Sequence, residues 1–151
     1  MKDKDYMRMA LGFAESAAEA GEAPVGCVIV DEATGDVVAG ASNAPIGLHD
    51  PTAHAEIIAM RRAAELAGNY RLRPGLTLYV TLEPCTMCAG AISAARIARV
   101  VYGASDPKGG AVESGVKFFD APTCHWRPAV EGGVLAEESA ALLRGFFKAR
   151  R

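Results

Sequence analysis

The sequence predicts an α/β sandwich in which a mixed sheet carries helices on both faces. Apolar stripes with helical spacing alternate along the middle of the chain with short β-branched runs, a pattern typical of α/β folds. The 151 residues are half hydrophobic, which suits one domain with a substantial core. The chain contains no internal repeat, low-complexity stretch or linker, so we expect residues 1–151 to form a single domain.

The N-terminal part predicts a helix followed by a hairpin. Apolar residues recur at steps of three and four over residues 4–20, which predicts an amphipathic helix that ends at Gly21. The recurring residues are Tyr6, Met9, Ala10, Phe13, Ala14 and Ala17. Residues 25–30 and 37–40 are apolar runs joined by a short turn, which predicts two strands, and residues 43–50 have the composition of a loop.

The remainder alternates helices and strands. Asp50 and Pro51 predict a helix start, with Asp50 as the cap and Pro51 in the first turn, and the helix continues to Gly68. The elements expected after it are a strand at 76–82, a helix at 85–96, a strand at 99–104 and a helix at 136–150. The last helix carries an apolar stripe, expected to face the core, of Leu142, Leu143, Phe146 and Phe147. The segment 105–134, with its Pro and Gly residues, predicts no regular element.

The most informative motifs are His54-Ala55-Glu56 and Pro84-Cys85-Thr86-Met87-Cys88. A structural zinc usually has four protein ligands, whereas a catalytic zinc has three and leaves one position to water. One histidine and two cysteines supply three ligands, and Glu56 supplies a carboxylate that need not be a ligand. The spacing H-x-E followed by P-C-x-x-C is the known signature of zinc nucleobase deaminases. We therefore predict zinc bound by His54, Cys85 and Cys88.

The expected chemistry is hydrolytic. Zinc lowers the pKa of a bound water to near 7, and the resulting hydroxide can attack a ring carbon that carries an amino group. Glu56 is the candidate catalytic residue, because it can take the water's proton, protonate a ring nitrogen and later protonate the departing ammonia. Both motifs also follow an acidic residue and a proline, which predicts two similar helix starts, and a helix start favours the Cys85 thiolate.

Other interpretations of these residues exist. A lone C-x-x-C also occurs in redox pairs and in zinc ribbons, but a ribbon needs a second cysteine pair, and Cys27 and Cys124 stand alone. A redox dithiol gives no reason for His54 and Glu56. Glutamate on a helix is usually a surface residue, which is the alternative for Glu56. We expect Cys27 to be a small core residue. His49 and His125 are expected in loops or at the surface.

Charge is unevenly distributed along the chain, whose net charge is -2. Residues 1–60 carry three basic and ten acidic side chains, whereas residues 61–151 carry thirteen basic and eight acidic. A basic face that binds a polyanion is one interpretation, and an ordinary solvated surface is the other. No apolar run is long enough for a membrane span, and the first residues lack the pattern of a signal peptide. Together with the predicted metal-binding cysteines, this favours a cytoplasmic protein.

Longer strings around the motifs resemble bacterial tRNA-specific adenosine deaminases of the cytidine deaminase-like superfamily over nearly the whole chain. The strings are Val25-Gly26, Ser42-Asn43, His49 to Glu56, Thr81 to Ile92, Tyr102 to Lys108 and Phe146-Phe147-Lys148. The resemblance implies a three-layer α/β/α sandwich with a mixed five-stranded sheet, a homodimer and one zinc per subunit. It implies conversion of the wobble adenosine of a tRNA anticodon to inosine, with release of ammonia. No DNA partner is expected.

The resemblance also assigns substrate contacts. Asn43 matches an asparagine that hydrogen-bonds the target base, and Asp106 and Lys108 match a loop that contacts the anticodon backbone. The alternatives are a loop turn for Asn43 and a solvated turn for the other two. Ser105 and the segment 118–126 depart from many relatives, and these departures concern RNA contacts only. Trp126 is expected either to stack a base or to lie in the core or a dimer interface.

Rival functions remain open from the residues alone. The first is a deaminase of free bases or nucleosides, such as a guanine or cytosine deaminase with the same metal site. The second is a catalytically silent RNA-binding module held together by zinc.

Overall fold

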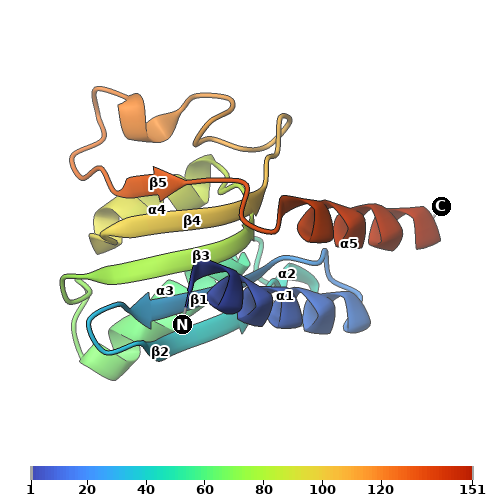
Figure 1. Cartoon of the computed structure of the whole chain (residues 1–151), viewed down its shortest axis with the longest axis horizontal. Coiled ribbons are helices and arrows are strands. Elements are labelled where there is room, and N and C mark those ends of the chain that lie inside the picture. The colour runs from blue at the N-terminus through green and yellow to red at the C-terminus, as the bar shows by residue number, and fades with distance from the viewer. Residues whose placement is uncertain (1, 151) are drawn as a thin grey trace.

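The fold is a mixed five-stranded sheet between two layers of helices, as predicted (Figure 1). The computed structural model describes residues 2–150. Its elements are α1 (Asp3–Glu19), β1 (Gly26–Asp31), β2 (Asp36–Ser42), α2 (Pro45–Leu48), α3 (Ala55–Ala67), β3 (Leu76–Leu82), α4 (Thr86–Ala95), β4 (Arg99–Ala104), η1 (Phe118–Asp120), β5 (Ala129–Glu131) and α5 (Ala136–Ala149). The strand order is β2-β1-β3-β4-β5. Strand β1 is antiparallel to both neighbours, and β3, β4 and β5 are parallel.

Alternation along the strands divides the core into two layers. Ile29, Leu78 and Val100 point to the face that α3 and α4 cover, while Val28 and Tyr79 point to the face that α1 covers. Successive side chains of a strand point to opposite faces, and because both faces are covered, the strands are apolar almost throughout. Helix α5 begins beside α1, against β3 and β4. No helix within residues 2–150 is long and apolar enough to cross a membrane.

Three of the secondary-structure predictions were wrong. Helix α3 begins at Ala55 and not at Asp50, because the Asp50 carboxylate accepts hydrogen bonds from the backbone N–H and the hydroxyl of Thr52. This local turn competes with helix formation. The predicted loop 43–50 contains the short helix α2, and strand β5 forms in the segment for which no element was predicted.

The predictions of which apolar side chains α1 and α5 bury were only partly correct. In α1 the side chain that packs against the sheet is Met7, whereas Met9 is exposed. In α5 the predicted core stripe is not buried: Phe147 is exposed, and Phe146 is half-buried beneath the guanidinium of Arg150. The reason is visible in Figure 1, where α5 extends beyond the ends of the strands, so that the sheet does not cover it. The residue that α5 buries is Ser139, whose hydroxyl donates to the carbonyl of Thr81.

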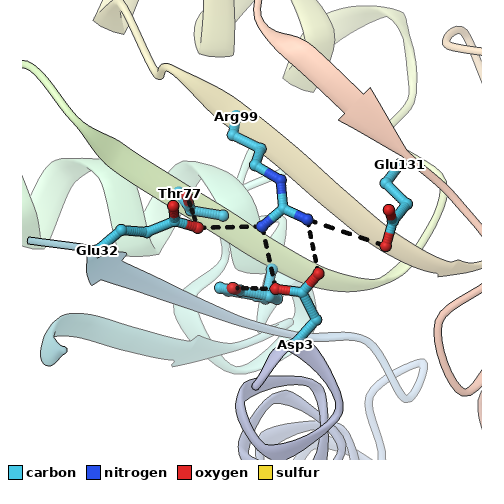
Figure 2. Close-up of polar contacts among 6 residues, drawn as sticks. Asp3, Glu32, Thr77, Arg99 and Glu131 are labelled. Carbon is cyan, nitrogen blue, oxygen red and sulfur yellow. Dashed lines mark hydrogen bonds and ion pairs between the residues drawn. The ribbon is translucent and has the colours of Figure 1, made fainter. Parts of the chain in front are cut away.

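Arg99, the first residue of β4, joins the N-terminal helix to the sheet (Figure 2). Its guanidinium donates to both carboxylate oxygens of Asp3, at 3.0 and 2.6 Å, and to Glu32 at 3.0 Å. Glu131 lies 3.9 Å away, and the hydroxyl of Tyr79 also donates to Asp3. One cation thereby holds three carboxylates from distant parts of the chain, at the end of the sheet opposite the helix starts of α3 and α4.

Candidate active site

The three predicted metal ligands meet where two helices begin. His54 is the N-cap residue of α3 and Cys85 is the N-cap residue of α4, both with extended backbone, and Cys88 lies one turn into α4. Helix α3 connects β2 to β3 and helix α4 connects β3 to β4. Both cross the same face of the sheet, so their N-termini lie at the same end of it. The predicted similarity of the two helix starts is therefore borne out, although each begins later than expected.

The donor atoms have the spacing of a tetrahedral zinc site. The Sγ atoms of Cys85 and Cys88 lie 3.6 and 3.5 Å from Nδ1 of His54, and the three atoms lie within 4.8 Å of one another. Zinc bonds of about 2.3 Å to sulfur and 2.05 Å to nitrogen, at a tetrahedral angle, give an S···N separation of about 3.6 Å. The two sulfur–nitrogen distances therefore fit a zinc ion, and three donors leave the fourth coordination position to a non-protein ligand.

The electrostatics of the donors also suit a cation. The pKa of Cys85 is lowered to about 4, chiefly because the Cys88 thiol donates a hydrogen bond to its sulfur and because His54 lies beside it. The same hydrogen bond, with burial, raises the pKa of Cys88. The hydrogen bond with Cys85 raises the pKa of His54. Cys85 is thus held as a thiolate, the form that binds metal, next to a second thiol that a dication would deprotonate.

Glu56 lies in the first turn of α3 and is 4% exposed, so it is not the surface residue that its position on a helix suggested as the alternative. Burial raises its pKa. It lines a cavity of about 310 Å³ together with His54 and Cys85. This volume is at the small end of the range for ligand sites and suits one base. A buried carboxylate beside a metal site in such a cavity can exchange protons with a bound substrate.

Two of the three predicted substrate contacts line the same cavity. Asn43 follows β2 and is tied to the segment before β1, because its Nδ2 donates to the carbonyl of Ala23 at 3.2 Å and its backbone N–H donates to Val25 at 3.0 Å. Asp106 follows β4 and also lines the cavity. Lys108 does not line it, but lies exposed two residues along the same loop.

Sequence reasoning missed two buried glutamates beside the cavity. Glu22 accepts hydrogen bonds from the backbone N–H groups of Ile46 and Gly47 and so holds the short helix α2, which follows Asn43. Glu83 holds the loop that contains Asp106. Neither has a sequence signal of its own, since its partners are backbone amides more than twenty residues away. Glu83 could have been suspected only from its place next to the cysteine motif.

The remaining candidates lie outside the site. Cys27 is buried in the core, as expected, and Cys124 is buried near Ser93. His49 and His125 are exposed. Trp126 lies outside the cavity and is 37% exposed, so it is not the core residue that one alternative expected; its indole N–H donates to the carbonyl of Ile97.

The fold and this site together define a class of protein. Residues 1–104 match the family model of the cytidine and deoxycytidylate deaminase zinc-binding region. The metal donors and Glu56 all fall within the matched residues. The chain is a zinc-binding deaminase of this class.

Comparison with individual proteins narrows the class. A tRNA-specific adenosine deaminase of Agrobacterium fabrum is 56% identical over 97% of this chain and 94% of its own length. A solved structure from work on A-to-I editing by tRNA:A34 deaminases at the wobble position superposes with a TM-score of 0.88 and 56% identity, over 92% of this chain and 99% of that chain. The guanine deaminase of Bacillus subtilis is more distant, with a TM-score of 0.66 and 33% identity over 99% of this chain and 94% of its own. The chain belongs to the family of bacterial tRNA-specific adenosine deaminases.

Proposed function

We propose that this protein hydrolyses the wobble adenosine of a tRNA anticodon to inosine and releases ammonia. The observation that carries the proposal is the single cavity that Glu56 shares with His54 and Cys85, two of the zinc donors, within a chain so similar to tRNA-specific adenosine deaminases. The reaction adds water across the C6–N bond, so that C6 gains an oxygen and the amino group leaves as ammonia.

His54, Cys85 and Cys88 would hold the zinc, which supplies a water activated at neutral pH. Glu56 takes the proton that this water loses and delivers it to N1 of the purine ring. Glu56 then takes a second proton from the hydroxyl now on C6 and passes it to the amino group, so that ammonia departs and C6 becomes the carbonyl of inosine. Burial raises the pKa of Glu56, which favours its protonated form and suits a group that must both accept and return protons.

Asn43 would bind the base edge. Its Nδ2 is held by the carbonyl of Ala23, which leaves Oδ1 available to accept a hydrogen bond from the purine. Asp106 would accept a bond from a ribose hydroxyl at the cavity rim, and the exposed Lys108 would meet a phosphate. Lys108 belongs to the more basic part of the chain, residues 61–151. A tRNA substrate would also place the enzyme in the cytoplasm.

The decisive experiment gives the purified, zinc-loaded protein a tRNA with a wobble adenosine and, in parallel, free adenosine, guanine and cytidine. Inosine in the tRNA supports the proposal. Activity confined to the free compounds would instead support a nucleobase deaminase, the activity named for the more distant relative.

A matched variant tests whether the domain is catalytic at all. Glu56→Ala is expected to lose turnover by a factor of about 10² to 10⁴ while it retains zinc, because it removes the proton-transfer group but no metal donor. Glu65→Ala, an exposed glutamate on the same helix, is the control and should behave as wild type. A silent RNA-binding module predicts no measurable change from Glu56→Ala.

The family resemblance also leads us to propose a homodimer, and an apolar groove on α3 and α4 is the surface that suits a second copy. The groove has a volume of about 440 Å³ and is lined mostly by apolar side chains, among them Ile57, Met60, Leu72 and Ala91. Sedimentation at several concentrations tests the dimer. Ala91→Arg, which places a charge in the groove, should shift the protein toward monomers, and an unchanged sedimentation coefficient would exclude this surface as the interface.

A further inference from the structure

Glu83 is the most heavily hydrogen-bonded side chain beside the active site. It directly precedes the Pro84-Cys85 turn and is 2% exposed. Its carboxylate accepts five hydrogen bonds, all from one loop. The donors are the backbone N–H groups of Asp106 (2.9 Å), Val112 (3.0 Å), Glu113 (3.0 Å) and Ser114 (2.9 Å) and the hydroxyl of Ser114 (3.0 Å). One carboxylate therefore holds both ends of the 106–114 loop.

The same loop is also joined to the cysteine turn by backbone contacts. Gly110 forms an isolated bridge with Cys85, and the N–H of Ala111 donates to the carbonyl of Pro84 at 2.9 Å. The loop thus runs from the cavity rim at Asp106 to the turn that carries a metal ligand. Within 106–114 it forms no helix or extended strand. Its conformation therefore depends on these contacts and on Glu83, together with the hydrogen bonds that the hydroxyls of Tyr102 and Ser105 donate to Glu113.

Gly110 shows how closely the loop packs on this carboxylate. A Cβ at position 110 would collide with the carboxyl group of Glu83. The backbone of Gly110 is not in the left-handed region, so the glycine is required here for space and not for its conformation. The loop backbone approaches Glu83 more closely than any other residue type would permit.

The carboxylate form of Glu83 is the one that this loop binds. Every donor is an N–H or O–H group, and only the ionised carboxyl offers both oxygens solely as acceptors. Without it, four partly buried backbone N–H groups would lose their partner, and the loop would open to reach water.

We propose that Glu83 is a positioning residue for deamination, which fixes the 106–114 loop, and with it Asp106, relative to the metal ligand Cys85. The proposal rests on the RNA contact proposed above for Asp106. One side chain would thereby fix the position of the RNA-binding rim relative to the metal centre. Glu83 also borders the cavity, but the loop occupies both oxygens of its carboxylate, so its effect on turnover acts through the loop.

The test is Glu83→Gln in the zinc-loaded, full-length protein. The amide retains one acceptor oxygen but presents an NH₂ group to N–H donors, so at least one end of the loop loses its partner. Hydrogen–deuterium exchange without RNA should become at least tenfold faster at the loop amides bonded to Glu83, with strand β3 unchanged. The KM for an anticodon stem-loop should rise about tenfold, more than kcat falls, with zinc content unchanged. Glu65→Gln, on the exposed face of α3, is the matched control.

A second variant approaches the same contact from the loop. Gly110→Ala pushes the loop off the carboxylate and should reproduce the faster exchange and the higher KM. In a Glu83→Ala background the added methyl group has room, so Gly110→Ala should add little. Unchanged loop exchange in both single variants, or KM effects that multiply in the double variant, would overturn the proposal. Failure of the wild-type protein to deaminate tRNA would refute the proposed function, whereas the RNA-free exchange measurement would still decide whether Glu83 anchors the loop.

Discussion

Replacing Arg99 by methionine tests whether one guanidinium fastens the N-terminal helix to the sheet. Methionine keeps most of the apolar stem but removes every donor. The variant loses two hydrogen bonds to Asp3 and one to Glu32, and it leaves the carboxylates of Asp3, Glu32 and Glu131 without the cation that they share (Figure 2). The active site lies at the other end of the sheet, so zinc binding should be unaffected.

The expected loss of stability in Arg99→Met can be worked out from the exposure of Arg99 and of the carboxylates that it binds. The side chains of Arg99 and Asp3 are 27% and 30% exposed, whereas that of Glu32 is 47% exposed. The paired hydrogen bonds with Asp3 are worth about 1.5 kcal/mol, because hydrogen bonds to charged groups contribute more than neutral ones but are partly screened here. The pair with Glu32 adds about 0.5 kcal/mol, as for an exposed ion pair. A total of about 2 kcal/mol corresponds to a fall in Tm of about 4–8 °C for a domain of this size.

Thermal unfolding of the zinc-loaded protein, followed by circular dichroism, measures this loss. Arg73→Met is the control, because Arg73 is 53% exposed and pairs with Asp31 alone, so it should cost less than about 1 kcal/mol. The Arg99 hydrogen bonds hold the pKa of Asp3 below its ordinary value of 3.8. Their stabilisation is therefore complete above that value and is lost as the pH falls through the lowered pKa of the folded state. The difference in stability between wild type and Arg99→Met should become smaller below pH 3.8. A difference that is absent at pH 7, or that stays constant down to about pH 3, refutes the reasoning.

Three further predictions concern the site. Cys85→Ala should lose zinc and turnover together, while Cys124→Ala, at a buried thiol outside the site, should keep the metal; metal analysis and activity distinguish them. Asn43→Ala should raise the KM for tRNA about tenfold with zinc retained, through loss of a hydrogen bond to the base, and steady-state kinetics that match wild type would remove Asn43 from the base site. Lys108→Glu should weaken tRNA binding. The slope of the logarithm of the binding constant against the logarithm of the salt concentration should become shallower, by the amount expected for the loss of about one to two phosphate contacts. An unchanged slope in a salt titration would place the RNA elsewhere.

Most elements could be predicted because their signals are local. The strand at 76–82 and the helix that ends at Gly68 have strong apolar patterns, and the structure contains both. Helix boundaries failed where a side chain offered the backbone another partner, as Asp50 does for Thr52. Burial along α5 failed for a different reason: an apolar stripe indicates which face is hydrophobic, but not whether the sheet extends far enough to cover it.

The metal ligands could be chosen from the sequence because zinc chemistry restricts residue type and spacing so strongly. His54, Cys85 and Cys88 were chosen without structural information, and their donor atoms do converge. The residues that hold the site in shape were not foreseeable in this way. Glu22 and Glu83 act on backbone amides, and backbone amides are the same at every position but proline.

The sequence by itself therefore determined the fold class, the candidate zinc donors and the candidate catalytic residue Glu56, because these depend on short motifs and on periodicity. Only the tertiary structure decided that Asn43 and Asp106 line the same cavity as Glu56, and that Glu83 joins the Asp106 loop to the turn of Cys85. The physical reason is that these relations arise from strand order and long-range hydrogen bonds. Strand order and long-range hydrogen bonds bring together residues that are far apart in the chain, and no local sequence pattern indicates which residues will meet.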